Sequence, residues 1–180
     1  AKKIQFKSKS VTFMGHNLTD KAVAPDPAKV TAITEMPRPT NKAGVQRFLG
    51  MCQYLSKFTP NLSERVLPLR KLTKQDAKFI WANTHKSAFQ TAKELIATTT
   101  VLRYYDVTKP VTLQVNASEE AIGVALLQEG QPVCFTSDCL DSTEKNYAQI
   151  EKECLAKECL TLAGLNYYYS YRLPTAGDHF

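Results

Sequence analysis

The stretch that decides the fold is Thr112-Leu-Gln-Val-Asn-Ala-Ser118, followed by Ala121-Ile-Gly-Val-Ala-Leu-Leu-Gln128. In the first run, Leu113 and Val115 alternate with polar residues, which predicts a half-buried strand that ends on a polar tip. An acidic pair at 119–120 marks a turn, and the second run predicts an apolar strand that returns. A third strand is predicted over residues 131–136, after a Glu-Gly turn. The pattern therefore predicts three consecutive antiparallel strands.

A long helix is predicted next, from Ser142 to about Leu165, with Asp141 or Ser142 as its cap. Glu144 completes a capping box with Asp141. Acidic side chains follow along this helix. Three antiparallel strands followed by one acid-bearing helix form the opening half of an RNase H-type α/β domain.

These runs resemble the RNase H domain in reverse transcriptases of gypsy-class LTR retroelements. Residues 113–128 are similar to that family's TDAS…G.GAVL.Q pattern, and residues 135–156 are similar to its Y.SR.L…E.NY…E.E.LA continuation. Asp178 and His179 resemble its TDH motif. The sequence departs from the family at one position, because the first catalytic Asp of the family falls on Asn116.

The formal net charge of +6 is unevenly distributed along the 180 residues. Residues 1–75 hold 14 Lys and Arg against 4 Asp and Glu, a net of +10, whereas residues 109–180 hold 5 against 10, a net of −5. A basic first part is typical of proteins that bind a polyanion such as a nucleic-acid backbone. The acidic second part fits either a carboxylate metal site or a solvated face.

Composition also restricts the setting of the protein. No run approaches the ~18 consecutive apolar residues of a membrane span, so no membrane association is expected. Five cysteines without zinc-type spacing predict reduced, mostly buried thiols and an intracellular location. The cytoplasm, the nucleus and a virus-like particle all fit. The start at Ala1, without Met or a secretory signal, suggests an excised piece.

The first residues predict two strands, over 4–6 and 10–18, joined by a basic turn. The second strand resembles the family's FLGH run, the hairpin that grips the primer strand. The resemblance implies that Phe13, Met14, Gly15 and His16 contact a primer 3′ end. The alternative is a hairpin that packs Phe13 inward and leaves His16 exposed.

Helices are predicted over the next hundred residues, ahead of the strands described above. The first spans 26–36 with Asp26 as its cap, and the second runs from residue 40 or 41 to about 59 with a buried stripe. A third, over 62–73, is bent or restarted at Pro68, and a fourth covers 86–97. The spacing of apolar residues resembles that of a reverse transcriptase thumb.

A second set of residues on the helix after residue 40 recurs every four positions, away from the stripe. These are Gln46, Gly50 and Tyr54, with Arg47 and Lys57 nearby. Gly inside a helix costs about 1 kcal/mol relative to Ala, which calls for a reason. The spacing is similar to a reverse transcriptase thumb helix, where Gln, Gly and an aromatic ring contact the minor groove. The alternative is a tight helix–helix contact at Gly50.

The RNase H resemblance implies a two-Mg²⁺ site. It assigns the central ligand to Asn116, a helix ligand to Glu153 and a fourth-strand ligand to Asp178, with Glu153 and Asp178 as the remaining metal ligands. Mg²⁺ prefers charged oxygen ligands, and Asn supplies one neutral oxygen. A degenerate site with weak Mg²⁺ binding is therefore expected. A mutated or engineered copy and a naturally inactive connection-type domain both explain Asn116.

The expected fold is α+β. A hairpin over 1–25 precedes a helical thumb over 26–108, and an RNase H-like domain with a mixed sheet, incomplete at its C-terminus, covers 109–180. The expected function is duplex binding within a reverse transcriptase, without catalysis by this chain alone. The alternatives are an Mg²⁺-dependent ribonuclease H and a domesticated protein that binds other proteins. The partners implied are an RNA–DNA or DNA duplex and the remainder of a reverse transcriptase polyprotein, with a homodimer left open.

Overall fold

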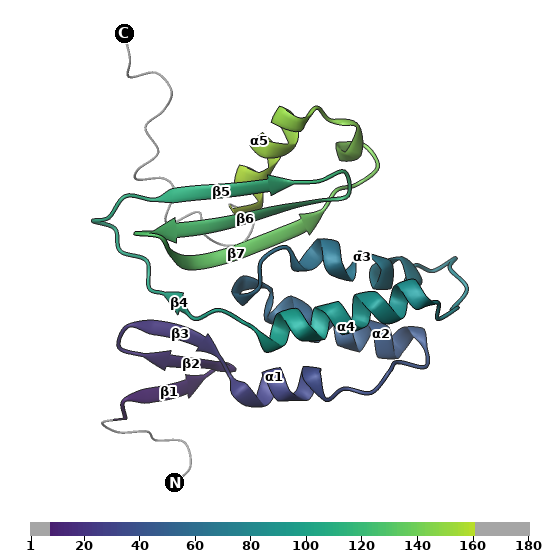
Figure 1. Ribbon diagram of the computed structural model, residues 1–180, viewed down its shortest axis with the longest axis horizontal. Helices are drawn as coiled ribbons and strands as arrows, with labels where there is room; N and C mark the ends of the chain where they lie inside the picture. The colour runs from purple at the N-terminus through teal and green to yellow at the C-terminus, as the bar shows by residue number, and fades with distance from the viewer. Residues whose placement is uncertain (1–7, 161–180) are drawn as a thin grey trace.

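The computed structural model describes residues 8–160. A cluster of four helices carries a three-stranded sheet on one side and adjoins a smaller four-stranded sheet (Figure 1). The expected α+β class is confirmed. The fourth strand of the expected mixed sheet, with Asp178, lies outside the described residues, and the three strands described are all antiparallel.

The smaller sheet contains a two-residue hairpin that the sequence pattern does not predict. Residues 10–18 were expected to form one strand, but the chain reverses at Met14 and Gly15, whose φ angles are 46° and 68°. Glycine adopts this left-handed region without a steric penalty, so it sets the place of the turn. The expected strand over 4–6 lies outside the described residues. The sheet order is β1 Ser10–Phe13, β2 His16–Thr19, β3 Ala22–Pro25 and β4 Leu102–Arg103.

The helices follow the predicted order, and the first two use the predicted caps, whereas the fourth starts at Asn83, earlier than the predicted residue 86. The side chain of Asp26 accepts a hydrogen bond from Ala28, and that of Asn41 accepts one from Gly44. The third helix does not restart at Pro68, and buried residues lie on both sides of the proline. The elements are α1 Pro27–Thr34, α2 Lys42–Tyr54, the 3-10 turn η1 Ser56–Phe58, α3 Leu62–Leu72 and α4 Asn83–Ala97.

These helices enclose the first hydrophobic core. The stripe predicted on α2 is buried, and its Phe48 ring lies 4.5 Å from the ring of Phe89 on α4, measured between centroids. Leu102 of β4 belongs to the same core, which joins the smaller sheet to the helices. The buried members are Ile33, Val45, Phe48, Cys52, Leu55, Phe58, Leu62, Val66, Leu69, Ala88, Phe89, Ala92, Ile96 and Leu102.

The three-stranded sheet consists of β5 Thr112–Ala117, β6 Ala121–Gln128 and β7 Gln131–Cys139. One face packs against α5 Gln149–Leu160 and forms a second core. The helix expected from Ser142 begins later than predicted. Asp141 and Glu144 do make the reciprocal capping bonds, but they cap the 3-10 turn η2 Glu144–Asn146. Tyr147 then has extended backbone, so the α-helix begins at Gln149.

The sheet docks on the helices through β7 and α3. The Ser63 backbone N–H donates to Ser137 Oγ (3.1 Å), and Ser63 Oγ donates to the Ser137 carbonyl (2.8 Å). The Phe135 side chain packs against the first core. Ion pairs of Lys71 with Glu120 (3.6 Å) and of Arg70 with Asp138 (4.0 Å) lie at the same junction. The three-stranded sheet therefore packs on the helical unit mainly through β7, which also contacts η1 and β4.

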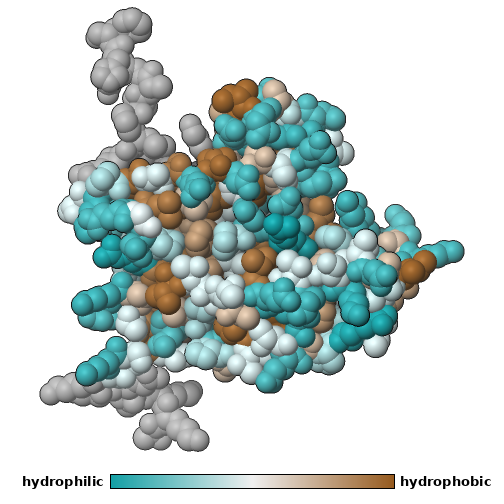
Figure 2. Space-filling model, viewed as in Figure 1, coloured by the Kyte–Doolittle hydropathy of each residue, from teal (hydrophilic) through white to brown (hydrophobic). Residues whose placement is uncertain are grey.

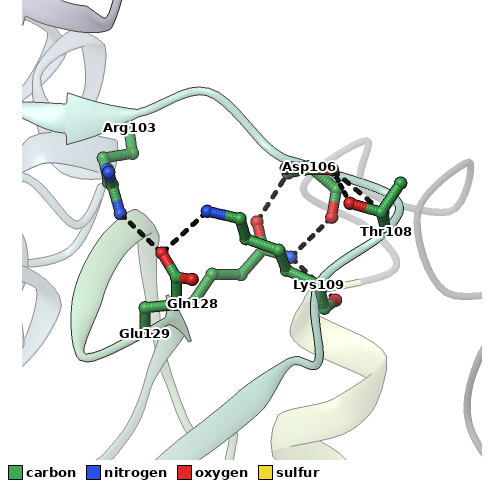
Figure 3. A network of polar contacts seen from close by, with 6 residues as sticks. All are labelled: Arg103, Asp106, Thr108, Lys109, Gln128 and Glu129. Carbon is green, nitrogen blue, oxygen red and sulfur yellow. Dashed lines mark hydrogen bonds and ion pairs between the residues drawn. The ribbon is translucent and has the colours of Figure 1, made fainter.

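Gln128 fixes the linker between the two cores (Figure 3). Its side chain is buried, accepts a hydrogen bond from the Asp106 N–H (2.9 Å), and donates to the carbonyls of Asp106 (2.8 Å) and Lys109 (3.1 Å). Glu129 pairs with Arg103 (3.2 Å) and Lys109 (2.8 Å). Gln128 therefore holds the linker with an amide, which both donates and accepts.

Replacing this amide tests that role. Gln128→Glu replaces the amide NH₂ with an oxygen that cannot donate to the carbonyls of Asp106 and Lys109. Leaving a buried polar group without its hydrogen bond costs about 1–3 kcal/mol of stability. We expect that loss in the free energy of unfolding, measured with urea at pH 7. The site favours the protonated carboxyl, which can donate again, so the loss should shrink as the pH falls through the raised pKa of the new Glu. Gln131→Glu, at an exposed position, is the matched control.

Candidate nucleic-acid interface

A groove of about 790 Å³ lies between the β1–β2 turn, α1 and α2. The turn contributes Met14 and Gly15, and α2 contributes Arg47, Gly50 and Tyr54. The remaining lining residues are Lys29, Ala32, Ile33, Met51 and Leu55. Five of the nine residues predicted to bind nucleic acid thus line one groove.

Gln46, Gly50 and Tyr54 are exposed on α2, opposite its buried stripe. A Cβ added at Gly50 would have no atom within 4 Å. The alternative of a tight helix–helix contact at Gly50 is therefore wrong. The missing side chain leaves bare backbone at the groove surface, which suits close approach by a flat ligand.

At the hairpin tip, the structure shows the opposite of the alternative in which Phe13 packs inward and His16 is exposed. Phe13 and Met14 are 60% and 76% exposed, whereas His16 is half-buried. The His16 ring lies between those of Tyr54 and Phe58, with centroid distances of 5.3 and 5.5 Å. The inward packing of Phe13 is wrong, because the turn at Met14 and Gly15 directs this strand end to solvent.

The basic residues near the groove differ in position. Arg47 and Lys29 line it, and both are exposed. Lys57 does not line it, and its ammonium lies 5.2 Å from the centre of the Phe58 ring. Desolvation by burial lowers the pKa of Lys57. Lys29 and Met51 were not predicted, because no sequence signal shows that α1 and α2 enclose a common groove.

Of the three residues assigned to the acidic site, two are described. Asn116 pairs with Gly123 at the end of β5 and lines a small crevice with Asn61 and Glu64. Glu153 is exposed on α5. The Gln149 amide donates to the Ala117 carbonyl (3.2 Å) and to Glu153 (3.5 Å), which places Glu153 near the same strand end. Asp178 lies outside the described residues.

The described residues do not fit a magnesium centre. Within 8–160, no group of three or more His, Cys, Asp or Glu side chains could hold a metal ion. Asn116 is uncharged, and the carboxylate of Glu153 meets an amide donor from Gln149. Mg²⁺ requires several hard oxygen ligands, usually charged ones.

Of the cysteine side chains that the structure describes, two are buried. The expectation of mostly buried thiols holds for Cys52 and Cys134, whose pKa values burial raises to about 12 and about 11. Cys139 is partly buried, and Cys154 on α5 is exposed. On the face in Figure 2, hydrophobic side chains lie in small groups among polar ones. None of the helices between residues 8 and 160 is long and apolar enough to span a membrane.

Three antiparallel strands followed by α5, attached to a helical unit, form the arrangement of an RNase H-like domain. Residues 81–163 match the family model of the RNase H-like domain found in reverse transcriptase. The matched range includes α4 as well as the second sheet.

The relatives are polyproteins of transposable elements. The chain is 35% identical over 181 residues to the retrovirus-related Pol polyprotein from transposon 297 of Drosophila melanogaster, and covers 17% of its length. It is 30% identical over 159 residues to the transposon Tf2-3 polyprotein of Schizosaccharomyces pombe, and covers 12% of it. These alignments include 98% and 86% of the chain.

Solved structures share the fold over nearly the whole chain. The foamy viral protease-reverse transcriptase in complex with RNA/DNA hybrid superposes with a TM-score of 0.79 and 22% identity, over 93% of this chain and 23% of that one. A dRH form of that protein in complex with double-stranded DNA gives a TM-score of 0.76 and 21% identity, over 88% of this chain and 29% of that one.

Asn116→Asp tests the acidic site. The new carboxylate lies at the end of β5, and two acids can hold one divalent ion with several waters. We expect calorimetry to show tighter Mg²⁺ or Mn²⁺ binding than for the unchanged chain, without cleavage of an RNA–DNA hybrid. Asn61→Asp adds the same charge across the crevice and is the control. Equal binding by both variants would contradict the assignment, as would cleavage by the unchanged chain.

Proposed function

We propose that the chain is the duplex-binding thumb and RNase H-like part of a gypsy-class retroelement reverse transcriptase. In this proposal residues 1–25 form the primer-grip hairpin, 26–108 the thumb and 109–180 the RNase H-like domain. The ligand is an RNA–DNA or DNA duplex, and the partner is the remainder of the polyprotein. RNA-directed DNA synthesis belongs to the whole protein, which works in the cytoplasm, nucleus or virus-like particle.

The groove between the hairpin tip and α2 is the observation that carries the proposal. It combines a glycine open to solvent and an aromatic ring along one helix face, with Arg47 and Lys29 in its lining. The exposed amide of Gln46 lies on the same face of α2, outside the groove lining. Flat apolar surface and bare backbone suit the sugar and base edges of a minor groove, while the cations suit phosphates. The net charge of +10 over residues 1–75 supports a polyanionic ligand.

The matched structures support the same ligand. The foamy viral proteins are described in complex with RNA/DNA hybrid and with double-stranded DNA, and they share this fold. The transposon polyproteins support membership of a longer reverse transcriptase chain. The neutral side chain of Asn116 argues against hybrid cleavage by this chain alone.

Salt dependence tests the proposal directly. If Lys29, Arg47 and Lys57 each neutralise one phosphate, log Kd should rise with log salt with a slope of about 2.7, or roughly 40-fold between 50 and 200 mM salt. Fluorescence anisotropy with a labelled RNA–DNA hybrid and a DNA duplex measures this slope. An affinity that stays flat over that range would rule out the proposed ligand.

Gly50→Val tests the groove itself. The added side chain enters open space in the protein but occupies the surface offered to the duplex, so we expect binding weaker by about tenfold. Helix propensity favours Val over Gly by a few tenths of a kcal/mol, so the melting temperature should stay level or rise. Ala43→Val, at an exposed α2 position outside the groove, should bind normally. Equal losses in both variants would contradict the groove assignment.

A further inference from the structure

The β1–β2 turn is attached to the helices through two consecutive carbonyl groups. The Met14 carbonyl accepts hydrogen bonds from the Tyr54 hydroxyl of α2 and from His16 Nδ1 (2.7 Å). The Gly15 carbonyl accepts one from the Asp26 backbone N–H (3.1 Å), at the cap of α1. Both peptide planes of the turn are therefore fixed from outside the hairpin.

His16 cannot replace Tyr54 as an anchor. It belongs to the hairpin, so its bond to Met14 only stiffens the turn internally. A carbonyl oxygen accepts only, so Nδ1 carries the proton, and Nε2 is buried without a partner among the described residues. The bond from Tyr54 is the one that joins the Met14 carbonyl to α2.

Gly15 shows how closely the phenol approaches the turn. A Cβ added there would lie 2.5 Å from the Tyr54 hydroxyl oxygen and 3.1 Å from the ring carbon that bears it. The φ angle of +68° also disfavours any side chain. Both constraints select glycine, and the first exists only because Tyr54 lies against the turn.

We propose that Tyr54 is a positioning residue, whose hydroxyl holds the hairpin tip over the groove so that the tip and α2 bind a duplex as one unit. This inference rests on the duplex-binding function proposed above. The tip exposes Phe13 and Met14, which depend on the turn for their direction. Without the Tyr54 bond, the Asp26 bond, the pairing of β2 with β3 and the ring contacts of His16 still hold the base of the turn. The Met14 peptide then loses its hydrogen bond to α2, so the tip gains freedom to move relative to Gly50 and Arg47.

Tyr54→Phe isolates the hydroxyl and keeps the ring. Two quantities are measured on the full chain: amide hydrogen exchange of residues 10–19 by mass spectrometry, and affinity for the labelled hybrid and DNA duplex. Loss of one hydrogen bond should speed exchange of the turn roughly 3- to 10-fold and weaken binding to a similar degree. The salt slope should not change, because no phosphate contact is removed. Tyr147→Phe, in the other sheet unit, is the control for loss of a phenol.

A double-mutant cycle with Gly15→Ala provides an independent test. Removing the hydroxyl removes the closest clash, so Gly15→Ala should weaken binding less in the Tyr54→Phe background than alone. Additive effects of the two changes on binding would contradict a contact between the phenol and the turn.

The outcomes separate this inference from the proposed function. Unchanged exchange with weaker binding would mean that the hydroxyl contacts the duplex directly, and the positioning role would be wrong. Faster amide exchange with unchanged duplex affinity would also overturn the positioning role. So would a variant in which neither exchange nor affinity changes. If the unchanged chain binds neither duplex, the proposed function fails, while the exchange data still decide whether Tyr54 holds the turn.

Discussion

The packing of α2 against α3 and α4 is the constraint on which the rest of the structure depends. Val45, Phe48 and Cys52 are almost completely buried, so the rotation of α2 about its axis is fixed. At 3.6 residues per turn, fixing one face fixes the opposite one, which carries Gln46, Gly50 and Tyr54. The groove follows from this, because α1 and the hairpin pack beside a helix that cannot rotate. The position of the exposed surface is thus a result of the core.

The sequence predicted the elements whose signal is periodic and local. The α2 stripe, the caps Asp26 and Asn41, and the three strands after residue 111 all rest on alternation, helical spacing or capping chemistry. Three features escaped prediction because they depend on distant contacts or very short segments. The turn at Met14 interrupts an otherwise regular strand pattern, β4 has only two residues, and α5 starts late because Tyr147 is extended.

The candidate interface was predicted in part for the same reason. Spacing alone placed the α2 residues on one face, and the structure brings Met14, Gly15, Arg47, Gly50 and Tyr54 to one groove. Lys29 lines the groove only because α1 packs beside α2, and no local sequence pattern predicts that packing. The proposed acidic site shows the opposite case. The neutral side chain of Asn116 can be seen in the sequence, whereas the contact of the Gln149 amide with Glu153 is seen only in the structure.

The contact of Phe135 with the first core makes the helical unit depend on the three-stranded sheet for its folding. Phe135 belongs to the three-stranded sheet, yet its side chain packs against the helical core, and Ser63 and Ser137 exchange two backbone–side-chain hydrogen bonds at the same junction. Deleting the sheet would expose apolar surface on the helices, whatever chemistry the sheet performs. Selection for folding alone would therefore preserve the sheet after its carboxylates had changed. An RNase H-like domain can in this way outlast its own active site as a structural part of its neighbour.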